Sequence, residues 1–211
     1  MPVLPRSARR LGLWLALAAG LGISPAGAMD FKLVEQPNGH TTLQGRGPIL
    51  PGDSRRFTGF VNTLEKIRLM DMLVFDSPGG FVDEAERMAY TIHNIGLPVT
   101  IGKGNFCVSA CVLLFAAAPN RTAAAGALIG VHRAATLKGQ ENKATLGATD
   151  GMTVHYELYG VPVSIIAKMR DTPPGGITWL TREDLSLMRV AIDPPTADRV
   201  ACVAFERERC L

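Results

Sequence analysis

The sequence predicts an α/β protein in which helices cover a mostly parallel sheet. Short apolar runs typical of buried strands, such as residues 72–76 and 128–131, alternate with segments that have apolar residues at helical spacing. Glycine-rich turns separate them, and the order strand, turn, helix recurs at least three times. Because no linker, charge block or internal repeat interrupts this pattern, we predict one domain over residues 29–211.

The first half of the chain has the clearest local signals. Two strands that pair across a turn are expected at 31–35 and 41–45. A helix capped near Asp53 should run to Leu64. The elements expected after it are a strand at 72–76, a helix at 82–95 that ends at Gly96, and a strand at 98–101.

The second half is predicted from weaker signals. Residues 109–118 are apolar and favour a helix, and residues 127–132 favour another buried strand. One long helix is expected from Thr149 or Asp150 to Arg170, closed by the prolines and glycines at 173–176. A short helical turn at 181–185 and a last strand within the tail 196–211 complete the predicted elements.

The N-terminus has the pattern of a secretory signal peptide over residues 1–28. Three arginines precede an apolar run at 11–23, and Ala26-Gly27-Ala28 offers a small-residue cleavage site. An uncleaved N-terminal anchor is the alternative interpretation. We predict export with cleavage and no transmembrane segment in the mature chain.

Removal of that leader changes the charge balance. The whole chain has 22 basic and 19 acidic residues, and the leader accounts for three of the basic ones. The mature chain is therefore close to neutral. No basic surface for nucleic acid is predicted.

All four cysteines lie in the mature part of the chain. In an exported protein an even number of cysteines favours disulfides, and three pairings are possible. We predict Cys107–Cys111 and Cys202–Cys210, because the members of each pair are close in sequence. A zinc site is the alternative, but the spacing lacks the short paired motifs of such sites.

Three polar or glycine-rich features follow predicted strands, where open α/β sheets place their sites. Gly79 and Gly80 form a turn that can present backbone N–H groups to a developing oxyanion, although it could also be an ordinary turn. Ser109 lies at the start of a helix, where a serine can be a nucleophile or simply an N-cap. His132 ends a strand and is either a general base or a buried histidine bonded to the backbone.

Taken together, these motifs resemble the proteolytic subunit of Clp protease and the wider crotonase-like fold. The matching segments are Ser77-Pro78-Gly79-Gly80, Cys107-Val108-Ser109-Ala110-Cys111, Asn120-Arg121 and Gly130-Val131-His132, in that order. The sequence is closer still to exported bacterial Clp-like proteins, in which cysteines flank the serine. The resemblance implies a ClpP/crotonase-like spiral of ββα units.

The resemblance also implies roles for individual residues. Ser109 would be the nucleophile and His132 the base, with Gly79 or Gly80 and Ala110 as oxyanion donors. The family's orienting aspartate has no match before Trp179-Leu180-Thr181. Asp171 is the nearest substitute in the chain and Asp184 is a second, unless the site is a dyad.

Two further site chemistries stay open at this point. A membrane peptidase of the same fold uses a serine–lysine dyad, but none of the lysines considered for that role lies in a matching motif. The lysines considered are Lys103, Lys138, Lys143 and Lys168. A thiol-redox role for Cys107 and Cys111 is the other possibility.

The favoured function is an exported serine hydrolase, most simply a peptidase in the bacterial periplasm. Its expected substrate is a peptide or an unfolded polypeptide, and no cofactor or metal is expected. The fold is also compatible with a homo-oligomer, because a sheet covered by helices exposes apolar helix faces. The alternative is a non-catalytic Clp-like domain that binds peptides or serves in assembly.

Overall fold

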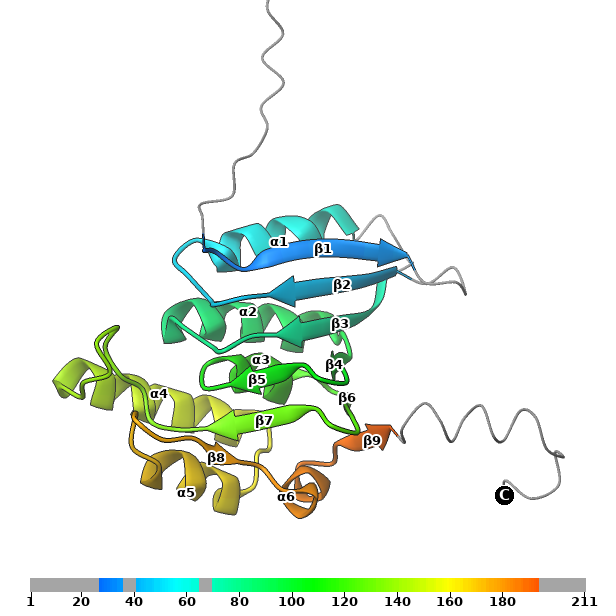
Figure 1. The fold of residues 1–211 in the computed structure, drawn as a ribbon. Helices are drawn as coiled ribbons and strands as arrows, with labels where there is room; N and C mark the ends of the chain where they lie inside the picture. Colours follow the sequence, from blue (N-terminus) through cyan, green and yellow to red (C-terminus); the bar gives the residue numbers. More distant parts are fainter. Residues whose placement is uncertain (1–26, 36–40, 65–69, 194–211) are drawn as a thin grey trace, which may run out of the picture.

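The computed structural model describes residues 27–35, 41–64 and 70–193, which form two sheets covered by helices (Figure 1). The larger sheet has the strand order β1-β2-β3-β4-β6-β9. Its strands are β1 (Asp30–Glu35), β2 (Thr41–Arg46), β3 (Met70–Asp76), β4 (Val99–Ile101), β6 (Arg121–Ala124) and β9 (Ala191–Asp193). The smaller sheet contains β5 (Phe106–Val108), β7 (Leu128–Val131) and β8 (Thr178–Trp179).

Most neighbouring strands are parallel. In the larger sheet only β1 and β2 are antiparallel, and in the smaller sheet β5 and β7 are parallel while β8 is antiparallel to β7. A bridge between Ser77 and Cys107 connects the chain just after β3 to β5. The turns that follow β3 and β5 therefore lie next to each other, and the predicted mostly parallel α/β architecture is confirmed.

Six helices are present in the described part of the chain. They are α1 (Asp53–Leu64), α2 (Val82–Ile95), α3 (Cys111–Ala117), α4 (Lys143–Leu158), α5 (Val163–Asp171) and α6 (Arg182–Leu187). In the view of Figure 1, α1 and α2 lie behind the first strands, and α4 and α5 lie near the smaller sheet. The central helix is α3, which packs against both α2 and α4 and has all seven residues buried.

Several predicted elements are confirmed by their local chemistry. The apolar positions of α2 lie on one buried face, and Gly96 ends this helix in a left-handed conformation with φ of 70°. The strands β1 and β2 pair over the full predicted length. The predicted turn at 37–39, the leader up to residue 26 and the tail strand at 196–211 lie outside the described residues.

The predicted long helix from Thr149 to Arg170 is wrong. The chain forms α4 and α5 instead, separated at Gly160, which has φ of 69°, and at Pro162, which precedes the first residue of α5. A left-handed glycine ends one helix, and a proline at the start of the next tolerates the missing N–H donor. The break places α5 beside the segment that follows His132.

Candidate active site

Ser109 occupies a tight turn between β5 and the central helix α3. Its φ is 57°, in the left-handed region that residues other than glycine rarely adopt. The Ser109 N–H donates to the carbonyl oxygen of Gly130 at 3.0 Å, and the Ser109 carbonyl accepts from Val112 N–H at 2.9 Å. A strained backbone held on both sides in this way is typical of turns that expose a functional side chain.

A disulfide between Cys107 and Cys111 spans this turn, which confirms the first predicted pair. Both cysteines are completely buried. The bond joins the middle of β5 to the first residue of α3, and Ser109 lies between its two ends. The predicted Cys202–Cys210 bond lies outside the described residues.

The turn at Gly79 and Gly80 packs directly against the Ser109 turn. Both glycines have positive φ, 88° and 149°. A Cβ atom on Gly79 would lie 2.5 Å from the Val108 carbonyl oxygen and 2.9 Å from both Ala110 N and Ser109 Cβ. Gly80 is held against Ile49, which donates its N–H to the Gly79 oxygen and accepts from Phe81 N–H. Only glycine allows the two turns to approach this closely.

Backbone donors near Ser109 differ in their availability. The Gly79 N–H donates to Ser77 Oγ at 3.1 Å. Within the described part of the chain, the N–H groups of Gly80 and Ala110 have no acceptor. Of the three residues predicted as oxyanion donors, Gly80 and Ala110 are therefore the two with unoccupied N–H groups.

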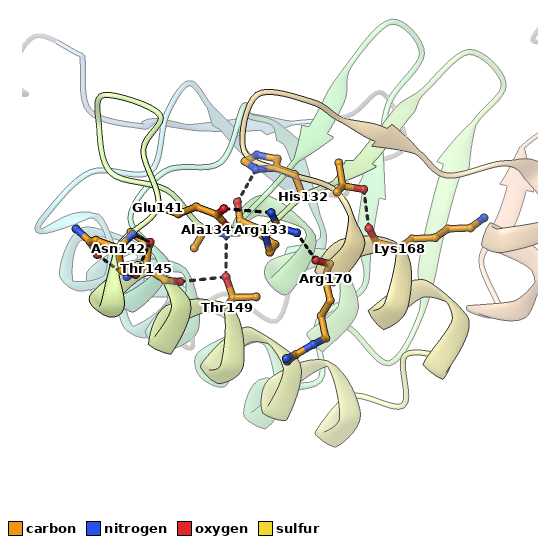
Figure 2. Close-up of polar contacts among 10 residues, drawn as sticks. His132, Arg133, Ala134, Glu141, Asn142, Thr145, Thr149, Lys168 and Arg170 are labelled. Carbon is orange, nitrogen blue, oxygen red and sulfur yellow. Dashed lines mark hydrogen bonds and ion pairs between the residues drawn. The ribbon is translucent and has the colours of Figure 1, made fainter.

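His132 follows β7 and is half-buried. Its Nδ1 lies 2.7 Å from the carbonyl oxygen of Arg133 (Figure 2). A carbonyl can only accept, so Nδ1 carries the proton of the neutral ring and Nε2 is left as an acceptor. That tautomer of the neutral ring is the one a general base needs toward a serine hydroxyl.

Ser109 and His132 line the same cavity of about 680 Å³, together with Pro78, Gly80 and Phe81. Within the described residues, the side chains of Ser109 and His132 form no hydrogen bond with each other. The site thus has the two side chains at one cavity without the contact that proton transfer requires. A substrate or a rotation of the Ser109 side chain would have to bring them into contact.

The two aspartates considered as a third residue lie elsewhere in the structure. Asp171 is the exposed last residue of α5 and acts electrostatically on Arg133, with no described hydrogen bond to His132. Asp184 is buried, and its oxygens bind Lys168 Nζ at 2.7 and 2.6 Å. Burial opposes ionisation of Asp184, but the hydrogen bonds from Lys168 and Thr181 hold its pKa below the usual value.

The structure also bears on the serine–lysine dyad, on a metal site and on a membrane span. Among the described residues, none of those that line the Ser109 cavity is a lysine, and Lys168 forms an ion pair with Asp184. Within the described residues, no group of three His, Cys, Asp or Glu side chains is arranged to hold a metal ion. None of the described helices is long and apolar enough to cross a bilayer.

A second cavity of about 510 Å³ also borders His132. Its walls include Phe106, Ile177 and Trp179, which are all partly exposed to solvent, and the glycines at 175 and 176. His132, Pro78 and Pro174 border both cavities. The histidine thus borders both an apolar cleft and the cavity that contains Ser109.

Sequence reasoning missed the Arg133 carbonyl as the partner of His132. It also missed β5, whose three residues fix the start of the Ser109 turn. Every residue has a carbonyl, so no residue type could have indicated the first of these. The apolar Phe106-Cys107-Val108 run was the only signal for the second.

The two sheets, the central helix and the adjoining glycine and serine turns define a ClpP/crotonase-like α/β fold. No protein-family model matches the sequence, and no curated protein is similar to it at a significant level. Solved structures nevertheless share the fold. One is a mutant of ClpP1 from Listeria monocytogenes, with a TM-score of 0.56 and 19% identity over 72% of this chain and 91% of that chain.

Two other solved structures are also similar to this chain. A mutant of the 1510-N membrane-bound stomatin-specific protease has a TM-score of 0.55 and 17% identity, over 75% of this chain and 81% of that chain. A member of the enoyl-CoA hydratase/isomerase family has a TM-score of 0.50 and 12% identity, over 84% of this chain and 74% of that chain. At sequence identities this low, the structural similarity establishes the fold alone.

Proposed function

We propose that the protein is a serine hydrolase that cleaves peptide bonds, with Ser109 as nucleophile and His132 as general base. The observation that supports this proposal best is the strained Ser109 turn, which faces the same cavity as a histidine with an acceptor Nε2. ClpP1 and the 1510-N stomatin-specific protease share the fold, and a mutant of the stomatin-specific protease was solved in complex with a substrate peptide. A peptide or an unfolded polypeptide is the proposed substrate.

In the proposed reaction, Ser109 Oγ attacks the carbonyl carbon of the scissile bond while its proton passes to His132 Nε2. The N–H groups of Gly80 and Ala110 stabilise the negative charge on the carbonyl oxygen. His132 then gives the proton to the leaving amine. A water molecule hydrolyses the acyl-enzyme by the same steps and releases the carboxylic acid.

The apolar cleft beside His132 indicates that the protein prefers substrates with an apolar side chain near the scissile bond. Phe106, Ile177 and Trp179 would hold a bulky apolar side chain next to the scissile bond. We further propose that the chain acts after export to the bacterial periplasm and removal of residues 1–28. We also propose that the chain associates into a homo-oligomer, which is compatible with these roles.

The proposed function is tested by labelling the purified protein with a fluorophosphonate probe, which reacts with activated serines. Labelling should occur in the wild type and be lost in both Ser109→Ala and His132→Ala. Circular dichroism and thermal unfolding of the variants provide the control for folding. Equal labelling of the wild type and Ser109→Ala would reject the proposal.

A second candidate function is a non-catalytic domain that binds peptides. The absence of a Ser109–His132 hydrogen bond in the described residues and the uncharged partner of His132 favour this candidate. It predicts a folded wild type that is not labelled by the probe. It also predicts that Ser109→Ala binds a peptide with the same affinity as the wild type.

A further inference from the structure

The peptide unit between Arg133 and Ala134 is fixed at both of its polar ends. Its carbonyl accepts from His132 Nδ1 at 2.7 Å, and its N–H donates to Thr149 Oγ1 at 3.0 Å (Figure 2). The peptide bond is planar and trans, so its C=O and N–H groups point in opposite directions. Whatever holds the N–H therefore also sets the direction of the carbonyl.

Thr149 is suited to hold this N–H because its own hydroxyl has a defined direction. The hydroxyl donates to the Thr145 carbonyl at 3.0 Å, one turn earlier on α4. A hydroxyl has one donor and two acceptor positions, so a lone pair remains for Ala134 N–H. Thr149 is 3% exposed and Ala134 is 5% exposed, so water competes little for this bond.

The same segment is tied down on its other side by Arg133. Its N–H donates to the Thr172 carbonyl at 3.0 Å, and its guanidinium binds the Glu141 carboxylate and the Arg170 carbonyl. Figure 2 shows the contacts of the Arg133 guanidinium with Glu141 and Arg170. The side chains of Arg133 and Glu141 are 25% and 31% exposed, whereas the contact between Thr149 and Ala134 is buried, so water competes more for the ion pair than for the Thr149 hydrogen bond.

We propose that Thr149 is a positioning residue for His132, acting through the Arg133–Ala134 peptide. Together they replace the carboxylate that orients the histidine in a Ser/His/Asp site. An orienting group selects the Nδ1–H tautomer and fixes the plane of the ring. The oriented carbonyl does both, although it adds no negative charge beside the imidazolium. The catalytic consequence rests on the proposed function, whereas the structural one does not.

The experiment compares three substitutions on the same helix. Thr149→Val keeps the shape but removes the hydroxyl, and Thr149→Ser keeps the hydroxyl. Thr153→Val is the matched control, because the Thr153 hydroxyl also bonds to a carbonyl one turn earlier, that of Thr149, but does not touch Ala134. All three are made in the full mature chain.

Two quantities are measured on each variant. The first is the second-order rate of fluorophosphonate labelling, and the second is the ring tautomer of His132 from its nitrogen chemical shifts at a pH where the ring is neutral. Thr149→Val should lower the labelling rate by about 10- to 100-fold, the range found for outer groups that orient metal-binding histidines, and should reduce the population of the Nδ1–H tautomer. Thr149→Ser should restore both, and Thr153→Val should change neither.

The outcomes separate this inference from the proposed function. If wild type is not labelled, the proposed function fails, but the tautomer in Thr149→Val still decides the role of Thr149. An unchanged tautomer and labelling rate in Thr149→Val would overturn the inference, as would equal effects of Thr149→Val and Thr153→Val. If Thr149→Val does not fold, Thr149→Ala against Thr149→Ser provides the same comparison, because these two differ only in the hydroxyl.

Discussion

Ser109 is one of two non-glycine residues with positive φ in the described part of the chain, the other being Arg189. A left-handed conformation costs a residue with a Cβ atom about 1 kcal/mol more than it costs glycine. We expect Ser109→Gly to be more stable than Ser109→Ala by about 1 kcal/mol. Urea denaturation measures the difference, and equal stabilities would show that the turn relaxes when the hydroxyl is removed.

Gly79 is the second residue on which the site depends. In Gly79→Ala the new Cβ would lie 2.5 Å from the backbone oxygen of Val108 at a φ of 88°. The Ser109 turn must then move and carry the Ala110 N–H with it, so the labelling rate should fall by at least about 100-fold, the effect of losing one oxyanion donor. Gly104→Ala is the matched control, because Gly104 has φ of 77° but no atom within 4 Å of the added Cβ. Equal labelling of the two variants would contradict the packing of the two turns.

At the scale of elements, one carboxylate joins the first two helices. Glu84, on α2, accepts from Ser54 N–H at 2.8 Å at the start of α1 and from Arg87 at 2.8 Å. Burial alone would raise the pKa of Glu84, but the hydrogen bonds from Ser54 and Arg87 lower it to about 2. The charge of Glu84 therefore stabilises the folded protein, since the unfolded chain binds the proton more tightly.

This pKa shift has a defined pH dependence. The stabilisation by Glu84 is complete above the unfolded pKa of 4.5 and is lost as the pH falls toward about 2. We expect Glu84→Gln to lower the free energy of unfolding by about 2 kcal/mol near neutral pH. The difference from wild type should shrink in urea denaturation at acidic pH. Glu183→Gln, at an exposed position of α6, is the control, and a pH-independent difference for Glu84→Gln would contradict this account.

At the scale of the whole molecule, α3 connects the layers. It packs against α2 and α4 and also against β4, β5 and β7, so both sheets depend on it. Phe115 lies in this helix and is completely buried. Phe115→Ala should therefore cost about 3–5 kcal/mol of stability and still unfold in one transition.

Leu137→Ala provides the comparison for Phe115, because Leu137 is 91% exposed and its truncation should be nearly neutral. Thermal unfolding of both variants, followed by two spectroscopic probes, measures the effect. Two separate transitions in Phe115→Ala would show that the sheets fold independently of α3.

The sequence predicted the layers because apolar periodicity and glycine turns act locally. The helix α2 follows from its apolar spacing and from Gly96, and both features were visible in the chain. The break between α4 and α5 was missed although Gly160 and Pro162 marked it, because apolar spacing continues on both sides. The strands β8 and β9 have two and three residues and depend on their partners rather than on local preference.

For the candidate site, the sequence predicted which residues share a region and the structure added how they are held. The approach of Gly79 to Ser109 follows from adjacent strand ends, so motifs at those ends indicated it. The availability of the Gly80 N–H, rather than that of Gly79, depends on the position of Ser77 Oγ. Such a contact is decided by packing and has no signature in the order of residues.

The acceptor for His132 is a main-chain oxygen, and this has a consequence for how such proteins evolve. All twenty amino acids bring the same oxygen to position 133, so no point mutation there can delete it. Substitution can only displace the oxygen by altering the residues that support it. Proteins whose histidine is bonded to the backbone can lose the acidic residue without losing the partner of the histidine. A search for three conserved catalytic side chains would not find such proteins.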